Sequence, residues 1–228
     1  MKSNDFESKT AFELLQWAES NYKRVGLASS FGLEDMVLID MVSKLGKKII
    51  LFTLDTGRLH EETYETMERV RSKYGLSISV YYPREEDVAQ LTTQKGFYSF
   101  RESLENRKEC CRIRKVEPLE RALSTLDAWI TGLRREQSVT RTDIPKVAED
   151  TDHPPLFKIS PLADWSADQV AEYLEKNKVP VNPLHKKNYP SIGCAPCTRP
   201  VLPGEDIRAG RWWWENPEHK ECGLHRRE

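Results

Sequence analysis

The sequence predicts an α/β fold in which helices cover both faces of a parallel sheet. Short apolar runs alternate with longer segments of helical periodicity along the first half of the chain. Small, polar, turn-forming residues follow most of these runs, which is typical of strands that are joined by single helices. A chain of 228 residues is also long enough to bury the core that such a sheet requires.

The expected elements follow from apolar spacing and from the residues that end each segment. Helical spacing begins with Phe12, Leu15 and Ala18, and Gly46 and Gly75 are typical helix stops. In chain order we expect a helix over residues 9–21, a strand over 25–28, a helix from 33 to Gly46, a strand over 48–54, a helix over 60–74, a strand over 76–82, a helix over 103–126 and a strand over 128–132. Ligands of such sheets bind at the carboxyl ends of the strands.

The second half of the chain is expected to be less regular. Residues 134–162 are polar and rich in proline, so we predict a long functional loop there. Ser166 is a good helix N-cap with Gln169 three positions later, and a helix should follow to about residue 176. We therefore divide the chain into a nucleotide-binding α/β domain over residues 1–200 and a mobile C-terminal tail over residues 201–228.

Charge and hydropathy exclude several classes of protein. The 35 Lys and Arg side chains nearly balance the 36 Asp and Glu side chains, so no overall basic field indicates nucleic acid or an anionic membrane. The longest apolar run, residues 49–52, is far shorter than a membrane span, and the first residues show no apolar signal-peptide stretch. We expect a cytoplasmic enzyme that binds neither nucleic acid nor a membrane.

Three strand ends carry candidate nucleotide-binding residues. The first is the loop of Ser29, Ser30, Phe31 and Gly32. It precedes a predicted helix, whose N-terminal N–H groups bind anions. Asp55 and Gly132 follow two other strands. Each loop alone is consistent with an ordinary turn, and the first matches neither the G-x-x-x-x-G-K nor the G-x-G-x-x-G spacing. Three such loops at one sheet edge favour a nucleotide site.

Five cysteines are the most informative feature of the sequence. Four of them form two tight pairs, Cys110 with Cys111 and Cys194 with Cys197. Four thiolates suit tetrahedral Zn²⁺ or an iron–sulfur cluster. Two adjacent side chains reach one small ion only with strain, whereas a cubane offers them separate iron atoms, so we favour a [4Fe–4S] cluster. A zinc site, or two inert thiols beside a thioredoxin-like redox pair, are the alternatives.

Basic residues surround the first cysteine pair. Between Arg101 and Lys115 the chain has six Lys or Arg side chains against three Glu side chains. On a helix, Arg114 would lie one turn beyond Cys110, and Lys115 one turn beyond Cys111. Cations at these positions would stabilise an anionic cluster or attract an anionic substrate, although a solvated helix face explains each of them equally well.

The fifth cysteine, Cys222, lies near the end of the chain among basic residues that include His225. A cationic neighbourhood lowers the pKa of a thiol and favours the nucleophilic thiolate. Arg208 and Arg211 precede three consecutive tryptophans at 212–214, which are expected to anchor the tail. Cys222 is therefore a candidate nucleophile. The alternatives are an incidental cysteine and an apolar latch without chemistry.

Together these motifs resemble the assimilatory adenylylsulfate (APS) reductases. The resemblance rests on Cys110-Cys111, on Cys194-x-x-Cys197 and on the terminal Glu221-Cys222-Gly223-Leu224-His225, and it runs from about Ser29 to His225. The related PAPS reductases keep the terminal motif but typically lack the four paired cysteines. Loop 29–32 corresponds to a modified pyrophosphate loop, and it departs from the S-G-G-x-D-S pattern of ATP pyrophosphatases, which argues against ATP hydrolysis.

The resemblance implies a fold, a cofactor and a reaction. The fold would be that of the adenine-nucleotide α-hydrolases, with a [4Fe–4S] cluster on the four paired cysteines. The Cys222 thiolate would attack the sulfur of APS, AMP would leave, and thioredoxin (alternatively glutaredoxin) would release sulfite from the S-sulfocysteine. By the same resemblance Lys115 and His225 assist Cys222. The substrate-binding residues would be Ser29, Ser30, Phe31, Gly32, Arg114, Arg208 and Arg211, together with Asp55 and Gly132, which the strand ends themselves indicate.

Two other functions fit the same motifs. One is a cluster-containing, nucleotide-dependent sulfurtransferase or tRNA-modifying enzyme, against which the balanced charge argues weakly. The other is a non-enzymatic iron–sulfur sensor that signals through Cys222. The sequence is compatible with a homo-oligomer and leaves the use of PAPS open.

Overall fold

The computed structural model describes residues 4–46, 48–137 and 143–216. The chain divides into two compact units, each assembled from three separate stretches. Unit 1 comprises Met1–Thr53, Glu65–Ser79 and Leu123–Asn182, and unit 2 comprises Leu54–Tyr64, Val80–Ala122 and Pro183–Glu228. The expected boundary at residue 200 falls within unit 2. A separate tail stays a prediction, because its last twelve residues lie outside the described part.

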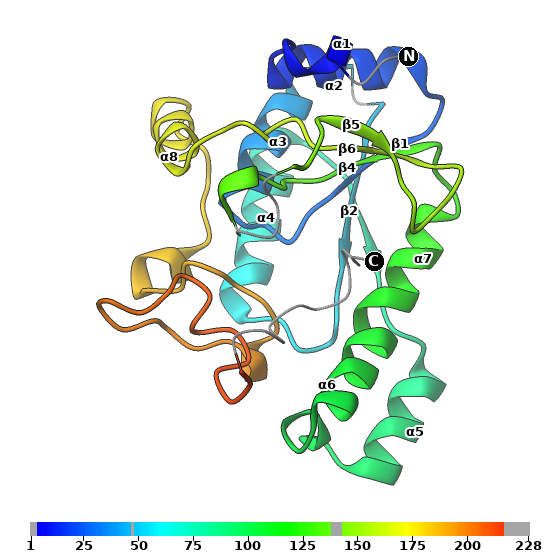
Figure 1. Cartoon of the computed structure of the whole chain (residues 1–228), viewed down its shortest axis with the longest axis vertical. Helices are drawn as coiled ribbons and strands as arrows, with labels where there is room; N and C mark the ends of the chain where they lie inside the picture. The colour runs from blue at the N-terminus through cyan, green and yellow to red at the C-terminus, as the bar shows by residue number, and fades with distance from the viewer. Residues whose placement is uncertain (1–3, 47, 138–142, 217–228) are drawn as a thin grey trace. The chain divides into compact units, whose positions relative to one another are not determined.

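A six-stranded sheet with the strand order β3-β2-β1-β4-β6-β5 forms the centre of the fold (Figure 1). Its strands are β1 (Val25–Ala28), β2 (Ile50–Leu54), β3 (Ile78–Tyr81), β4 (Ala128–Ile130), β5 (Val147–Glu149) and β6 (Phe157–Ile159). Strand β1 is parallel to β2 and β4, and β4 is parallel to β6. Strand β5 pairs antiparallel with β6 at the edge. The predicted α/β class is confirmed.

The prediction of a long irregular loop over residues 134–162 was wrong in part. Strands β5 and β6 lie within it, and β6 extends the sheet beside β4. Each of these strands has only three residues, too few to show the alternation of apolar and polar side chains by which a strand is recognised. Their pairing depends on β4, which lies close in space but not in sequence.

Unit 1 contains five helices among the described residues, and the predicted N-cap Ser166 is confirmed for the last of them. They are α1 (Asn4–Glu7), α2 (Ala11–Asn21), α3 (Leu33–Ser43), α4 (Glu61–Tyr74, whose first turn belongs to unit 2) and α8 (Ala167–Lys176). Thr10 with Glu13, and Ser166 with Gln169, form capping boxes. Helix α3 is buried on almost every side and packs against α2 and α8. It therefore holds the loop that precedes it against the ends of the strands.

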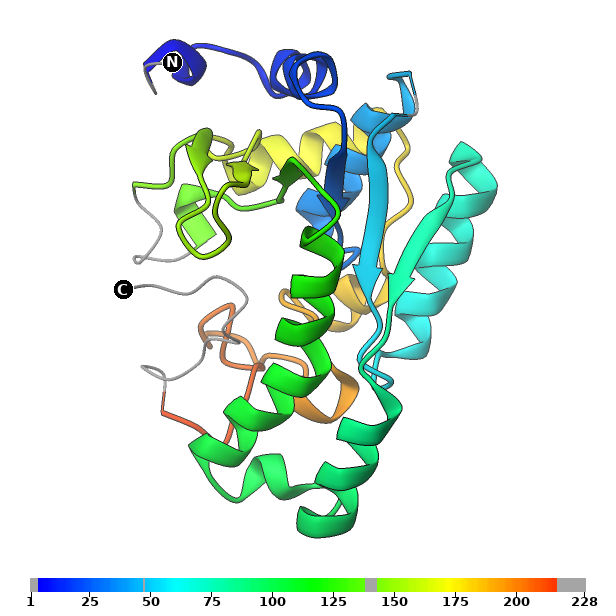
Figure 2. The ribbon, with the colours of Figure 1, turned by 90° about the vertical axis from the view of Figure 1, so that its right-hand side faces the viewer.

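The long helix expected over residues 103–126 is continuous but irregular (Figure 2). It consists of α6 (Leu104–Cys111), a π-helical turn over Arg112–Val116 and α7 (Glu117–Leu123). Pro118 explains the turn, because proline lacks the N–H that would bond to the carbonyl of Arg114 and its ring clashes there. The extra residue in this turn follows directly on the cysteine pair. Helix α5 (Glu85–Lys95), also in unit 2, was not predicted.

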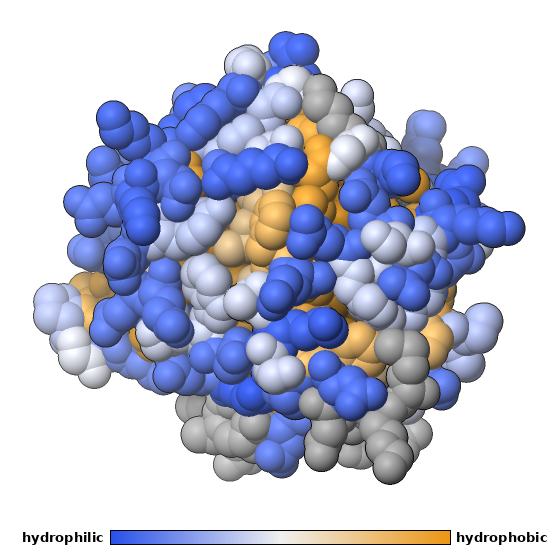
Figure 3. All heavy atoms as spheres, turned by 90° about the horizontal axis from the view of Figure 1, so that it is seen from above, coloured by the Kyte–Doolittle hydropathy of each residue, from blue (hydrophilic) through white to orange (hydrophobic). Residues whose placement is uncertain are grey.

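The described helices include none that is long and apolar enough to cross a membrane. The face drawn in Figure 3 is mostly hydrophilic, with apolar atoms visible between polar side chains.

Candidate functional site: a cavity lined by four cysteines

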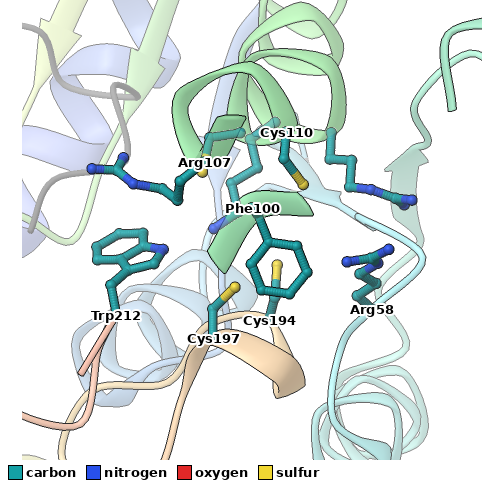
Figure 4. Close-up of a pocket in the computed structure, with 10 residues that line it drawn as sticks. Arg58, Phe100, Arg107, Cys110, Cys194, Cys197 and Trp212 are labelled. Carbon is teal, nitrogen blue, oxygen red and sulfur yellow. The ribbon is translucent and has the colours of Figure 1, made fainter. Parts of the chain in front are cut away.

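The two cysteine pairs meet around one cavity in unit 2 (Figure 4). Cys110 and Cys111 end helix α6, and Cys194 and Cys197 flank a 3₁₀ turn in a loop more than 80 positions later. Cys110, Cys111 and Cys194 are buried, and Cys197 is half-buried. The atom-free space between these side chains amounts to about 350 Å³, including the part that is open to solvent. The structure thus brings together the four thiols that the sequence proposed as one ligand set.

Cations and aromatic rings complete the wall of this cavity. Its lining consists of the four cysteines with Arg58, Phe100, Arg107, Arg114, Lys115 and Trp212. The π-helical turn carries Arg114 and Lys115, and both reach the same cavity as the cysteines one turn before them. π-Helical turns occur frequently at functional sites. The expectation that these two cations lie beside the first cysteine pair agrees with this lining.

The loop after β2 holds the second cysteine pair in place. The Thr56 hydroxyl lies 3.3 Å from the Cys194 sulfur, and the Thr56 carbonyl accepts a hydrogen bond from Arg114 Nη1 at 2.6 Å. The carbonyl of Arg58 accepts a hydrogen bond from the N–H of Ala195 at 2.8 Å. The Asp55 carboxylate accepts hydrogen bonds from Gly57 N–H and from the Tyr64 hydroxyl. Asp55 therefore shapes this loop, and its neighbours contact the cavity wall.

Three of the four thiols, those of Cys110, Cys194 and Cys197, differ in pKa because their surroundings differ. Burial raises the pKa of Cys197 to about 12, and the nearby Cys194 adds to this. Burial also raises the pKa of Cys110, against the opposing charges of Arg114 and Arg58. For Cys194 burial acts in the same direction, but Lys115 and the hydrogen bond from Thr56 outweigh it and lower the pKa. The surroundings of Cys194 therefore ease its deprotonation, in contrast to those of Cys110 and Cys197.

Two buried hydrogen-bond donors of the wall have no partner among the described residues. They are Arg114 Nε and the indole Nε1 of Trp212. Arg114 is 6% exposed and Trp212 is 1% exposed, so water does not readily satisfy them. In Figure 4 the ring nitrogen of Trp212 lies on the edge that faces the cavity. Because buried donors are nearly always bonded in proteins, these two atoms indicate a ligand with acceptor atoms in the cavity.

The segment of residues 211–215 closes one side of the cavity. The N–H of Trp212 donates to the carbonyl of Cys197 at 3.1 Å. Trp214 packs on the buried cluster that contains Phe100 and Cys110, whereas Trp213 is exposed. Of the three tryptophans predicted to anchor the tail, Trp212 and Trp214 contact the cavity wall and its support.

Arg211 and Arg208 occupy different environments. Arg211 is buried, stacks on the Trp212 ring at 4.5 Å and donates to the Ser191 hydroxyl at 3.3 Å. Its guanidinium lies so close to Gly193 that a Cβ atom there would clash with it. Arg208 is half-buried, and its N–H donates to Asp206. The expectation that both arginines grip substrate stays a prediction.

In unit 1, the loop of Ser29, Ser30, Phe31 and Gly32 is closed by its own hydrogen bonds. The N–H and the hydroxyl of Ser30 both donate to the Asp35 carboxylate, at 2.6 and 2.8 Å. The N–H of Phe31 donates to the Ser29 hydroxyl, and the N–H of Ser29 donates to the carbonyl of Phe52. Gly132 lies against the same carboxylate, since a Cβ atom at this position would come 2.5 Å from Asp35 Oδ1.

Two predicted catalytic residues, Cys222 and His225, lie outside the described residues, and their roles stay predictions. The structure adds Thr56, Arg58 and Arg107 to the residues around the cysteines. Thr56 and Arg58 follow Asp55 at the end of a predicted strand, so the turn-forming residues at this strand end were the pattern from which they could have been predicted. Arg107 carried no signal beyond its place in a basic helix.

Comparisons with known proteins show the family of the chain. Residues 24–200 match the phosphoadenosine phosphosulfate reductase domain family. An adenosine 5'-phosphosulfate reductase of Allochromatium vinosum is 51% identical over 96% of this chain and 85% of its own length. This chain belongs to the adenosine 5'-phosphosulfate reductase family. A second member of the family, from Burkholderia cepacia, is 50% identical over 93% of this chain and 84% of its own length.

Solved structures confirm the predicted α/β fold of this family member. A phosphate complex of the phosphoadenylyl-sulfate reductase from Candida auris has a TM-score of 0.75 and 27% identity, covering 86% of this chain and 94% of that chain. An FMN adenylyltransferase from Candida glabrata has a TM-score of 0.57 at 14% identity, covering 93% of this chain and 72% of that chain. The second similarity shows the fold alone.

Proposed function

We propose that this chain reduces adenosine 5'-phosphosulfate (APS) to sulfite and AMP in sulfate assimilation, with thioredoxin as the electron donor. Family membership makes the chain an oxidoreductase that acts on sulfur. The observation that carries the finer proposal is the cavity, where both cysteine pairs meet Arg114 and Lys115. A sulfurtransferase or a sensor would not explain why relatives that match nearly the whole chain are APS reductases.

We propose that Cys110, Cys111, Cys194 and Cys197 hold a [4Fe–4S] cluster. Among the described residues, no three His, Cys, Asp or Glu side chains are grouped so that they could hold one metal ion. Four thiols around one cavity suit a cofactor with several metal ions, each bound by one thiolate. The unpartnered donors Arg114 Nε and Trp212 Nε1 fit the sulfur atoms of such a cofactor. When bound, the cluster would supply fixed charge and rigidity beside the cations of the wall.

The reaction proposed for Cys222 is a displacement at sulfur. Its thiolate attacks the sulfur of APS, the bond from that sulfur to the AMP oxygen breaks, and AMP leaves with the electron pair. The product on the enzyme is S-sulfocysteine. AMP is already a good leaving group, so this step needs no strong general acid. His225, three positions beyond Cys222, is proposed to assist it near the substrate.

Reduced thioredoxin, or alternatively a glutaredoxin, completes the cycle. One of its thiolates attacks the Cys222 sulfur and displaces sulfite, which forms a mixed disulfide. The second thiol of thioredoxin then attacks that disulfide, so thioredoxin leaves oxidised and the Cys222 thiolate is regenerated. Two electrons pass from thioredoxin to the sulfur that leaves as sulfite, and no electron needs to pass through the four-cysteine site.

Cations of the chain are proposed to bind the anionic groups of APS. Lys115 lines the cysteine cavity and would stabilise negative charge that moves during attack. Arg114, Arg208 and Arg211 are proposed to bind the phosphosulfate, since guanidinium groups recognise such oxygens with paired hydrogen bonds. The remaining proposed substrate-binding residues are Ser29, Ser30, Phe31, Gly32, Asp55 and Gly132. The proposed location of the enzyme is the cytoplasm.

An anaerobic preparation of the full chain tests this proposal. The protein should contain about four iron and four sulfide ions, and with thioredoxin it should release sulfite from APS. The same assay with PAPS measures the specificity for a 3'-phosphate. Active protein that is colourless and holds one zinc ion would contradict the cluster. Sulfite formation from neither substrate would contradict the proposed reaction.

A further inference from the structure

Arg107 lies on helix α6, and its buried guanidinium is hydrogen-bonded to the carboxylate of Glu215, which is 108 positions later in the chain. It is 1% exposed, and its Nε and Nη2 donate to the two carboxylate oxygens of Glu215 at 2.9 and 3.0 Å. The side chain of Glu215 is itself only 8% exposed. A bidentate pair of this kind fixes both the distance and the orientation of its partners. It ties the segment of residues 211–215 to α6.

The same arginine contacts a cysteine of the cavity. Arg107 lies one helical turn before Cys111, lines the cavity and interacts with the Cys111 side chain through charge and a hydrogen bond. Its guanidinium also stacks on the Trp212 ring at 4.9 Å. In Figure 4, Arg107 and Trp212 lie on the same side of the cavity. One side chain thus touches the cysteine site, the tryptophan wall and Glu215.

The anchored segment adopts a backbone conformation that needs support. Trp212 has a φ of +40°, in the left-handed region that bulky side chains rarely adopt. Such a conformation persists only where its surroundings hold it. Its supports are the hydrogen bond to the Cys197 carbonyl and the guanidinium groups of Arg107 and Arg211 at 4.9 and 4.5 Å from the ring centroid. Two of these supports belong to the wall of the cysteine cavity.

We infer that the buried Arg107–Glu215 pair couples the filling of the four-cysteine cavity to the anchoring of the segment that leads to Cys222. This inference rests on the proposed cofactor. Glu215 stands seven positions before Cys222, so whatever fixes residues 211–215 also fixes where the chain to Cys222 starts. Arg107 is therefore a positioning residue that acts through Glu215, and it need not touch the substrate.

The coupling follows from shared walls. Arg107 and Trp212 face the cavity on one side and support residues 211–215 on the other. Filling the cavity gives both side chains contacts that an empty cavity withholds, so the filled form holds the segment more tightly. By thermodynamic linkage the reverse also holds: if filling of the cavity stabilises the anchored segment, then anchoring of residues 211–215 stabilises the filled cavity by the same free energy. Loosening the Arg107–Glu215 pair should therefore make the cavity release its contents sooner.

Glu215→Gln tests the inference, because it removes one charge while keeping the size of the side chain. The matched control is Glu109→Gln, which breaks the partly exposed Lys95–Glu109 pair on the same helix. In the anaerobic holoenzyme, the rate at which a chelator removes iron should rise roughly 5- to 150-fold for Glu215→Gln, the usual range of coupling between sites. The control should release iron at the wild-type rate. Circular dichroism checks that both variants remain folded.

A second measurement needs no variant. Amide hydrogen exchange over residues 208–216 of the wild type should be slower in the iron-loaded than in the stripped protein by a comparable factor. The first turn of helix α5, residues 85–87, contributes nothing to the cavity lining and should exchange alike in both forms. Equal exchange at 208–216 in both forms, with iron bound, would overturn the coupling and leave the cofactor intact. Protein that binds no iron would instead overturn the proposed cofactor and the coupling with it.

Discussion

The loop after β1 and the wall of the four-cysteine cavity both carry polar groups in sheltered positions, but they satisfy them differently. In the loop, the described N–H and hydroxyl groups of Ser29 and Ser30 already donate to or accept from neighbours, above all the Asp35 carboxylate. In the wall, Arg114 Nε and Trp212 Nε1 are buried without a partner in the described part of the chain. The loop is closed by its own hydrogen bonds, whereas the wall leaves two buried donors for the cofactor that we propose.

This difference indicates which of the two regions is better suited to bind a ligand. A buried donor without a partner costs about 1–3 kcal/mol, so two of them in one cavity wall favour a group in the cavity that accepts hydrogen bonds from them. An anion that approaches Ser30 must instead compete with Asp35, a carboxylate that the sequence did not single out. The cavity wall is therefore the stronger structural indication of a site than the loop that the sequence favoured first.

The largest expected effect separates the wall cysteines from Cys222. Cys111→Ser should lose most of its iron and all sulfite formation, because a serine hydroxyl is a poor ligand for iron. Cys222→Ser should keep its iron and bind APS but form no sulfite, since a serine hydroxyl is a far weaker nucleophile than a thiolate. Iron content and sulfite release measure both. A Cys111→Ser protein with full iron content would show that the wall does not act as a ligand set.

Lys115→Ala comes next in size. Removal of one preorganised cation from a sheltered site typically lowers the rate about 10²- to 10³-fold, so kcat/KM for APS should fall by that factor while the protein stays folded. Lys108→Ala, on the exposed side of the same helix, is the control and should change little. Equal kinetics for wild type and Lys115→Ala would reduce this residue to a surface charge.

The closed loop gives a pH-dependent prediction. Burial raises the pKa of Asp35 to about 6 from an ordinary value of 3.8, although hydrogen bonds from Ser30 oppose the shift. The folded protein thus holds this proton more tightly than the unfolded chain between about pH 4 and 6, and the stability that it contributes below pH 4 is lost as the pH rises through 6. By pH 7 that loss amounts to up to about 3 kcal/mol.

Asp35→Asn isolates this contribution, because the amide carries no charge at any of these pH values. Urea unfolding of both proteins from pH 4 to 7 measures it: the difference in their free energies of unfolding should change with pH, and changes from all other groups cancel. A difference that is constant over this range would show that Asp35 titrates normally and that the loop is not closed by a buried carboxylate.

The smallest expected effect concerns the contact between the two loops of unit 1. Gly132→Ala places a methyl group against Asp35 Oδ1 and the α3 backbone, and overpacking of this kind costs about 1–3 kcal/mol. Gly32→Ala is the matched control, since its nearest neighbour, Ser30 Oγ, lies at an ordinary 3.6 Å and its φ of −72° suits alanine. In thermal unfolding, Gly132→Ala should melt at a lower temperature than Gly32→Ala. A lower melting temperature for Gly32→Ala would contradict the close approach at Gly132.

The sequence allowed us to predict which residues make up the candidate site better than it allowed us to predict the contacts between them. The two cysteine pairs indicated one shared site although they are far apart in the sequence. Helical spacing placed Arg114 and Lys115 beside the first pair, in agreement with the lining of the cavity. The Arg107–Glu215 pair could not be predicted, because its partners stand 108 positions apart and both types are common on surfaces. Pro118 is a sequence signal for an irregular turn, but the apolar pattern of the helix continues through the π-helical turn and therefore predicted a regular helix.

The most direct test of the central claim is a single turnover without reductant. Wild-type enzyme mixed with APS in the absence of thioredoxin should release one AMP and gain one SO₃ adduct on the peptide that contains Cys222. Reduced thioredoxin should then remove the adduct as sulfite. An adduct on Cys110, Cys111, Cys194 or Cys197, or release of AMP without any adduct, would move the chemistry away from Cys222 and contradict the account.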